Sequence, residues 1–220
     1  MNIAGVFPNE KIKHFLKNLK YSLYVIVHPF DGFWDLTHEK RGSLSVANFI
    51  VFMYLVTHIL RLQYTSFLFY IVDWEEINMI MEVLSLLAPI FLWSISNWSL
   101  TTLMDGKGAL RQIYIGTAYA ITPQVIIGLP LILLSNLVTV EEGVFYTYLS
   151  SFSTIWTGFL ILCAMMMIHD YSLGKAVFSS LLTIIGMGVI IFILLLFFSL
   201  VSDGVGYFVS MYKEIAFRLY

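Results

Sequence analysis

Long apolar runs separated by short polar stretches dominate the chain between residues 46 and 201. Each run is about twenty residues long, the length that an α-helix needs to cross roughly 30 Å of hydrocarbon. The runs predict transmembrane helices at about 46–64, 82–103, 114–135, 147–168 and 177–201. The sequence therefore predicts an all-α polytopic membrane protein, a bundle of five transmembrane helices.

Two of these spans are irregular. In the first, His58 and Arg61 interrupt an apolar run that continues to residue 72, so one long tilted helix and a shorter helix ending near Tyr64 both fit. The third contains Pro123 and Pro130. A spanning helix tolerates proline because neighbouring helices and waters satisfy the carbonyls that proline frees, so we expect a kink there.

Segment 11–27 has the pattern of an amphipathic helix. Its apolar positions are Ile12, Phe15, Leu16, Leu19 and Leu23, and its lysines are residues 13, 17 and 20. This pattern predicts an interfacial helix whose lysines reach anionic cytoplasmic lipid head groups, although a soluble partner-binding helix has the same pattern. His28-Pro29 breaks the helical pattern, and a polar linker then continues to about residue 45.

The positive charges favour a cytoplasmic N-terminus. Six lysines and arginines precede the first span, and Lys107, Arg111 and Lys175 lie in alternate loops, whereas loops 73–81 and 136–146 carry only acidic charges. Lysine and arginine are enriched in cytoplasmic loops. We therefore expect a cytoplasmic segment at 1–45, a membrane domain at 46–201, and an outward-facing amphipathic tail at 202–220.

Composition excludes several classes of protein. Apolar residues make up 59% of the chain and charged residues only 12%, less than in soluble domains. A net charge of −2 gives no support for a nucleic-acid partner. Cys163 is the only cysteine, so an intramolecular disulfide or a multi-cysteine metal site is impossible. We expect no cofactor and no metal.

A polar stripe runs down the second span. Ser94, Asn97, Thr101 and Asp105 follow the spacing i, i+3, i+7, i+11 and therefore share one helix face. Such a face avoids lipid. We expect it to hydrogen-bond to an adjacent helix, with the third span as the candidate because its small residues, such as Gly116, allow close approach. A water-filled pocket is the alternative.

Two pairs of residues could carry chemistry. His58 and Arg61 share a helix face inside a span, where a charged group is a functional candidate, although Arg61 could snorkel or pair with an acid. His169-Asp170 ends the fourth span, but adjacent helical residues point about 100° apart, so this pair is no preformed dyad. Catalytic and metal-binding motifs are absent, and we predict that the protein is not an enzyme.

The loop between the second and third spans carries a recognisable motif. Asp105-Gly106-Lys107-Gly108, followed by Tyr114 and the segment 117–123 (TAYAITP), resembles the bacterial branch of the Yip family, the Ypt/Rab-interacting membrane proteins. The match in number and spacing of spans covers about residues 29–201. Family members have a cytoplasmic N-terminus and five clustered spans.

The resemblance implies a non-enzymatic membrane protein that scaffolds, recruits or assists assembly of other membrane proteins. A transporter complex is one candidate client, and the bacterial cell membrane is the implied location. Eukaryotic relatives bind small GTPases through a long N-terminal region with an Asp-Leu-Tyr-Gly-Pro motif, which this chain lacks, so small-GTPase binding is not supported. A small transporter or channel that uses the polar stripe is the alternative function.

The charge asymmetry gives a testable topology. Single cysteines would be placed in each loop of a Cys163→Ala background, and intact cells would be treated with a membrane-impermeant thiol reagent. Only the cysteines on the outer side of the membrane should be labelled. We expect protection at the N-terminus and in loops 104–113 and 169–176, and labelling in loops 73–81 and 136–146 and at the C-terminus. Labelling at residue 107 together with protection at residue 142 would reverse the orientation.

Overall fold

The structure, a computed structural model, describes residues 8–70 and 77–219, and every regular element in these ranges is helical. The elements are α1 (Pro8–Val27), α2 (Pro29–His38), α3 (Leu44–Tyr64), α4 (Met79–Leu103), α5 (Leu110–Ala120), α6 (Thr122–Ser135), α7 (Gly143–His169) and α8 (Leu173–Leu219). Five stretches are long and apolar enough to cross a membrane: α3, α4, α5 with α6, α7, and α8. The prediction of an all-α polytopic membrane protein is confirmed.

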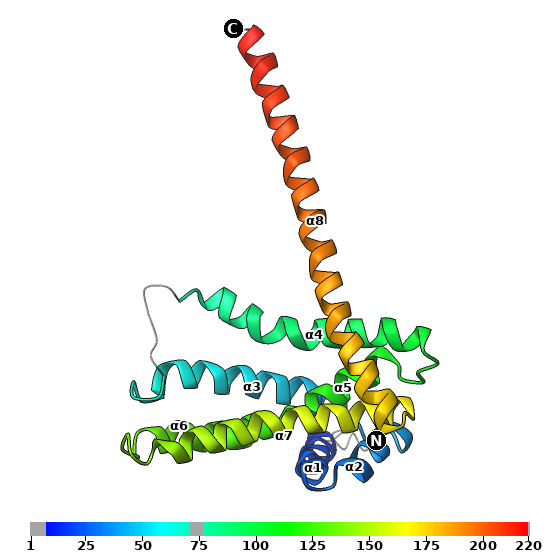
Figure 1. Ribbon diagram of the computed structural model, residues 1–220, viewed down its shortest axis with the longest axis vertical. Coiled ribbons are helices and arrows are strands. Elements are labelled where there is room, and N and C mark those ends of the chain that lie inside the picture. The colour runs from blue at the N-terminus through cyan, green and yellow to red at the C-terminus, as the bar shows by residue number, and fades with distance from the viewer. Residues whose placement is uncertain (1–7, 71–76, 220) are drawn as a thin grey trace, which may run out of the picture.

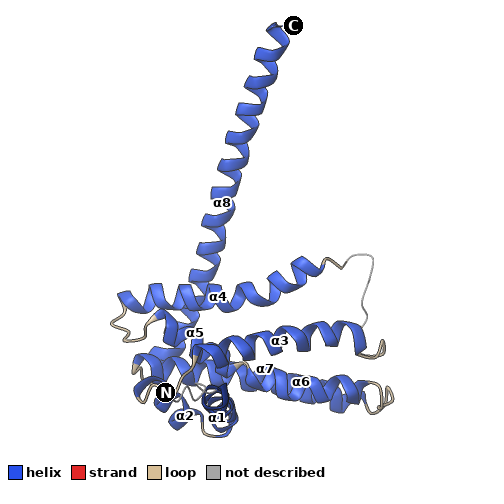
Figure 2. Ribbon diagram, turned by 180° about the vertical axis from the view of Figure 1, so that it is seen from behind, coloured by secondary structure: helices blue, strands red, loops and turns tan. Residues whose placement is uncertain are grey.

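Four of the five candidate spans lie side by side, and the fifth leaves them (Figure 1). α6 packs along α7 and beside α3, while α4 contacts α5 and the first part of α8. α1 and α2 form a short layer across one end of α7, with α1 also touching α3, α5 and α6. Seen from behind, α8 crosses α4 steeply and projects away from the other helices (Figure 2).

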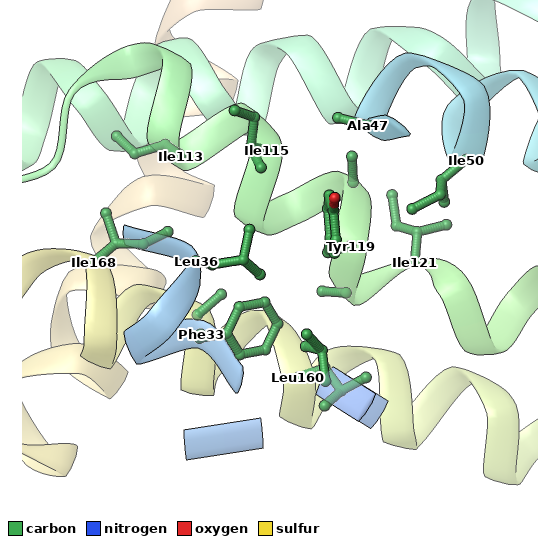
Figure 3. Packing of buried hydrophobic residues seen from close by; sticks show 14 of the residues in the cluster. Phe33, Leu36, Ala47, Ile50, Ile113, Ile115, Tyr119, Ile121, Leu160 and Ile168 are labelled. Atoms are coloured by element: carbon green, nitrogen blue, oxygen red, sulfur yellow. The ribbon is translucent and has the colours of Figure 1, made fainter. Parts of the chain in front are cut away.

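An apolar core lies where α2, α3, α5 and α7 meet (Figure 3). Phe33, Tyr119 and Leu160 have no exposed surface, and Ile168 is 5% exposed. A small residue permits this contact: a Cβ on Gly116 would stand only 2.6 Å from Cδ1 of Ile168. Gly116, expected from the sequence to face the polar side of α4, therefore faces α7.

The segment after His28 is a helix, and its prediction as a polar linker was wrong. Pro29 lies in the first turn of α2, where a proline needs no N–H partner and its fixed φ suits a helix. Phe33 and Leu36, three residues apart, are buried on one side. Gly32 lets this side approach α1, because a Cβ there would lie 2.9 Å from the Cα of Val25. The proline that ends one helix thus begins the next.

The irregular spans take definite forms. α3 ends at Tyr64, which is the shorter of the two predicted alternatives. The third span breaks between α5 and α6, where Pro123 cannot donate to the carbonyl of Tyr119. The Thr122 hydroxyl donates to that carbonyl instead, over 2.6 Å.

The predicted outward loop 73–81 lies partly outside the described residues, because residues 71–76 are not described.

α8 is a continuous helix of 47 residues, so it is about 70 Å long, more than twice the hydrocarbon thickness. Its buried residues all lie in the first few turns: Ala176, Ser179 and Thr183. From residue 191 onward almost every described side chain is exposed. No helix break marks the predicted boundary between the fifth span and the tail at 202, so the tail continues the axis of the span.

The close contact at Gly116 makes a prediction about stability. Gly116→Val should lower the free energy of unfolding by about 1–3 kcal/mol, because the new side chain overpacks the interface with Ile168 and Ala164. Gly158→Val in α7 is the matched control, since a Cβ there meets nothing within 4 Å. Thermal unfolding in detergent would compare the two. Equal losses at the two positions would show that the contact with α7 does not set the cost.

Candidate functional site

His169 stands at the centre of a buried set of polar contacts at one end of the molecule. It is the last residue of α7 and is 1% exposed. The backbone N–H of Gly108 donates to its Nδ1 over 3.2 Å, and its Nε2 lies 3.0 Å from Oδ1 of Asn97. A backbone N–H can only donate, so Nδ1 accepts and Nε2 carries the proton of the neutral ring. One imidazole therefore joins the α4–α5 turn to α4.

Asn97 carries the hydrogen bonds onward to α8. With its amide oxygen accepting from His169, its amide nitrogen donates to Oγ1 of Thr183 over 3.0 Å. The Thr183 hydroxyl in turn donates to the carbonyl of Ser179 over 2.8 Å. Gly108, His169, Asn97 and Thr183 are thus linked in series, and each makes at least one of these hydrogen bonds. We call the four residues Gly108, His169, Asn97 and Thr183 the polar chain.

Two glycines fit the α4–α5 turn onto the imidazole. A Cβ on Gly106 would lie 2.8 Å from Nδ1 of His169, and a Cβ on Gly108 would lie 2.6 Å from its Cε1. The N–H of Gly106 donates to the carbonyl of Thr101 over 2.7 Å, which closes the end of α4. Any larger residue at 106 or 108 would push the ring away from the turn.

Tyr171 supports the same turn from the α7–α8 connection. Its ring stacks on His169 with centroids 5.2 Å apart, and its hydroxyl donates to the carbonyl of Met104 over 3.1 Å. Burial, followed by the negative charge of Asp105, raises the pKa of this hydroxyl. The group therefore stays a neutral donor. The carboxylate of Asp105 is exposed and makes no hydrogen bond with a described residue, so His169 and Tyr171 hold the turn, and Asp105 does not.

An ion pair ties the outer side of the turn to the end of α7. Nζ of Lys107 lies 2.9 Å from Oδ2 of Asp170, and Nε2 of His38 in α2 lies 3.8 Å from the other carboxylate oxygen. The Lys107 side chain is 73% exposed, and exposed pairs contribute only about 0–1 kcal/mol. Asp170 has a φ of 55°, a left-handed conformation that ends α7 and turns its carboxylate toward the turn. The surface of the site is therefore charged, while its floor is a neutral polar chain.

Most of the predicted site residues gather here, but their roles differ. Asn97 joins helices, whereas Ser94 donates to the carbonyl of Ile90 and Thr101 to that of Asn97, both within α4. Through Asn97 the stripe hydrogen-bonds to α7 and α8, and Gly116 of the expected partner helix faces α7. Residues 105–108, His169 and Asp170 lie together around one turn.

Sequence reasoning missed the α8 side of the site. The Ser96 hydroxyl donates to the carbonyl of Thr183 over 2.8 Å, and a Cβ on Gly186 would lie 2.5 Å from that hydroxyl. A signal was present: Ser179, Thr183 and Gly186 follow the spacing i, i+4, i+7 in an otherwise apolar span. Small and polar residues on one face of a spanning helix indicate a helix contact.

The second candidate pair lies away from this site, toward the other end of α4. His58 approaches Glu82, with Nε2 and Oε2 3.0 Å apart, and so joins α3 to the first turn of α4. Arg61 stands over the ring of Tyr70, 5.4 Å from its centroid. Within residues 8–70 and 77–219, no group of three or more histidine, cysteine, aspartate or glutamate side chains could hold a metal ion.

Comparison with known proteins places the whole arrangement in one family. The model of the Yip1 domain matches residues 23–212, which is most of the chain. The chain belongs to the Yip1 domain family. The resemblance seen in the sequence is therefore confirmed at the level of the family. The matched part of the Yip1 domain includes α2 to α7 and the polar chain. No curated protein and no solved structure matches the chain.

The polar chain predicts that substitution of Asn97 lowers stability, as expected if this residue joins helices and does not line a solute pocket. Asn97→Leu removes two interhelical hydrogen bonds, and such bonds average about 0.6 kcal/mol each in membranes. It also leaves the buried Nε2–H of His169 without its acceptor. A buried unpaired donor costs about 1–3 kcal/mol, so we expect a loss of about 2 kcal/mol in unfolding free energy. Thr102→Val, on the exposed side of α4, is the control and should change little.

A double-mutant cycle tests whether the contact with α8 is direct. Thr183→Val and Asn97→Leu should be non-additive, since each removes one end of the same hydrogen bond. Thermal unfolding of the parent, the two single variants and the double variant gives the coupling energy between residues 97 and 183. Additive losses would mean that Asn97 and Thr183 act independently and that the polar chain does not reach α8.

Proposed function

We propose that this Yip1 domain protein is a non-enzymatic scaffold that recruits other integral membrane proteins or assists their assembly, with a transporter complex as one candidate client. The observation that carries the proposal is the polar chain. It joins α4, the α4–α5 turn, α7 and α8 into one unit and uses its histidine to hold backbone in place. The imidazole has both nitrogens engaged by protein groups, so neither is free to act on a substrate.

The α4–α5 turn is the proposed docking surface in the aqueous phase. Asp105 and Lys107 project from it with exposed side chains, while the backbone beneath them is held at Gly106, Gly108 and Met104. A rigid backbone lowers the entropy lost when a partner binds. Exposed charges of both signs on a fixed turn favour a partner with a complementary charge pattern.

α8 is the proposed contact surface within the membrane. It is strongly apolar, and beyond residue 190 almost none of its described surface is covered by the rest of the chain. Lipid tails satisfy such a surface, and so do the apolar helices of another membrane protein, through van der Waals packing. One end of α8 is tied to the polar chain at Thr183, so a partner on α8 would act on an element anchored to the turn.

The location we propose is a bacterial cell membrane, with the N-terminus cytoplasmic and the C-terminus outside. The arrangement of the loops supports it. Lys107, Asp170 and His38 meet at one end of the molecule, and there α2 joins the turns after α4 and α7. At the other end, Asn136 donates to the carbonyl of Tyr64, which brings the loops after α3 and α6 together. Lys107 and Lys175 thus lie at the first end, and Glu141 and Glu142 belong to the loop at the second, which fits the positive-inside rule.

A small transporter or channel is the second candidate, and one feature favours it. A cavity of about 60 Å³ lies among α3, α6 and α7, lined by polar residues that include His58, Arg61, Gln124 and Ser153. Ligand pockets are usually about 300–1,000 Å³, so this cavity suits a few waters. It does not include the polar stripe of α4. The scaffold remains the better-supported function.

A charge swap on the turn tests the docking surface. Asp105→Lys combined with Lys107→Glu exchanges the two charges and keeps the net charge. Partners that copurify with the tagged parent in mild detergent, identified by mass spectrometry, should fall about tenfold or more, because like charges would now face each other. Lys13→Glu with Asp31→Lys is the matched control, because both residues are exposed on α1 and α2, outside the two proposed contact surfaces, and this variant should retain the partners.

Two other measurements bear on the rival functions. Purified parent protein in liposomes should show no specific solute flux, and His169→Ala or Asp170→Ala should abolish no turnover. Flux that disappears in Asn97→Leu at unchanged stability would favour the transporter. A turnover lost on substitution of His169 in a folded protein would make the protein an enzyme.

A further inference from the structure

A basic cleft lies where α1, the α2–α3 connection and the start of α5 meet. Its volume is about 530 Å³, within the usual range for ligand sites. Lys17 and Tyr21 of α1 line one side, Lys40 and Arg41 of the connection another, and Arg111 of α5 a third. These residues come from three separate parts of the chain, so the cleft exists only in the folded protein.

The cations of the cleft outnumber the acids available to them. Arg41 engages the nearby carboxylates, with its guanidinium 3.1 Å from Asp35 and 2.6 Å from Glu39. Lys17, Lys40 and Arg111 make no ion pair with a described residue. Three positive charges therefore face one cleft without a protein counter-charge. Such a site attracts an anion.

A second cavity, of about 350 Å³, shares Lys40, Gly42 and Arg111 with the cleft. Its floor is apolar and is formed by Phe33 and Leu36 of α2 with other core side chains, among them Ile115 and Ile168. The same two cations thus stand over a basic cleft on one side and an apolar cavity on the other. A ligand that filled both would have an anionic group joined to an apolar chain.

The position of the cleft fits a ligand that comes from the bilayer. It lies beside the first residues of two candidate spans, α3 at Leu44 and α5 at Leu110, and so at the membrane boundary. The first turn of α3 adds N–H groups that no side chain of its cap engages. The amphipathic α1, whose Leu16 and Leu23 are about half exposed, forms the outer wall.

We propose that the cleft and the adjoining cavity form a binding site for one anionic phospholipid. Its phosphate lies between Lys40 and Arg111, with Lys17 beside it, and part of an acyl chain lies over Leu36 and Ile115. Bound lipid would connect α1 and α2 to α5. This assigns a ligand to a part of the molecule separate from the turn and α8, and it stands whether or not the protein is a scaffold.

Lipid binding to the purified full-length chain tests the proposal. Phosphatidylglycerol and phosphatidylcholine with the same acyl chains would be titrated in detergent and followed by native mass spectrometry and by thermal shift. Phosphatidylglycerol should bind and raise the unfolding temperature, and phosphatidylcholine should do so far less. Lys40→Gln with Arg111→Gln should weaken phosphatidylglycerol binding roughly thirtyfold, since each cation near a lipid surface contributes about 1 kcal/mol.

Controls keep the result interpretable. Lys213→Gln with Arg218→Gln removes two cations from the distant end of α8 and should bind like the parent. Lys17→Gln is a second test that does not depend on the folding of the double variant, because Lys17 is on the exposed side of α1. It should weaken phosphatidylglycerol binding roughly fivefold. Equal binding of both lipids, or unchanged binding in the Lys40 and Arg111 variant, overturns the site. Stabilisation by inorganic phosphate equal to that by lipid would make it a free-phosphate site and overturn the lipid assignment.

Discussion

The shape of the α4–α5 turn and the attachment of α8 both depend on one set of buried hydrogen bonds, from Gly108 through His169 and Asn97 to Thr183. Buried in a membrane protein, these groups cannot hydrogen-bond to water, so each needs a hydrogen-bond partner within the protein. An imidazole, an amide and a hydroxyl together offer both donors and acceptors. They can therefore be linked in series, with each member donating a hydrogen bond to the next acceptor.

The polar chain also explains why charge appears on the surface of the site and not beneath it. Lys107 and Asp170 meet where water can solvate them, whereas the buried members carry no formal charge in the arrangement observed. Burying an ion pair would cost several kcal/mol per ion in desolvation. A neutral floor with a charged rim is the cheaper way to hold a turn at the membrane boundary and still present charges to a partner.

The remaining helices are held by packing, and here small residues decide which surfaces meet. Gly116 brings α5 against α7, Gly32 brings α2 against α1, and Gly186 brings α8 against α4. Because lipid tails are as apolar as the side chains they would replace, close van der Waals contact must supply the association. After its first turns α8 is almost entirely exposed among the described residues, and it projects away from the other helices (Figure 1).

The sequence by itself determined the number, type and approximate limits of the spans, because crossing hydrocarbon demands long apolar helices whatever their neighbours. It also singled out Asn97, His169 and the turn at 105–108, since polar residues and glycines stand out in apolar runs. Only the tertiary structure decided which groups pair: Asn97 with Thr183 some 86 residues away, and His58 with Glu82. It also decided that the segment after Pro29 is a helix with a buried face, because α2 packs against α7, α1 and α5. Pairings between distant residues leave no local pattern, so their partners are chosen by packing alone.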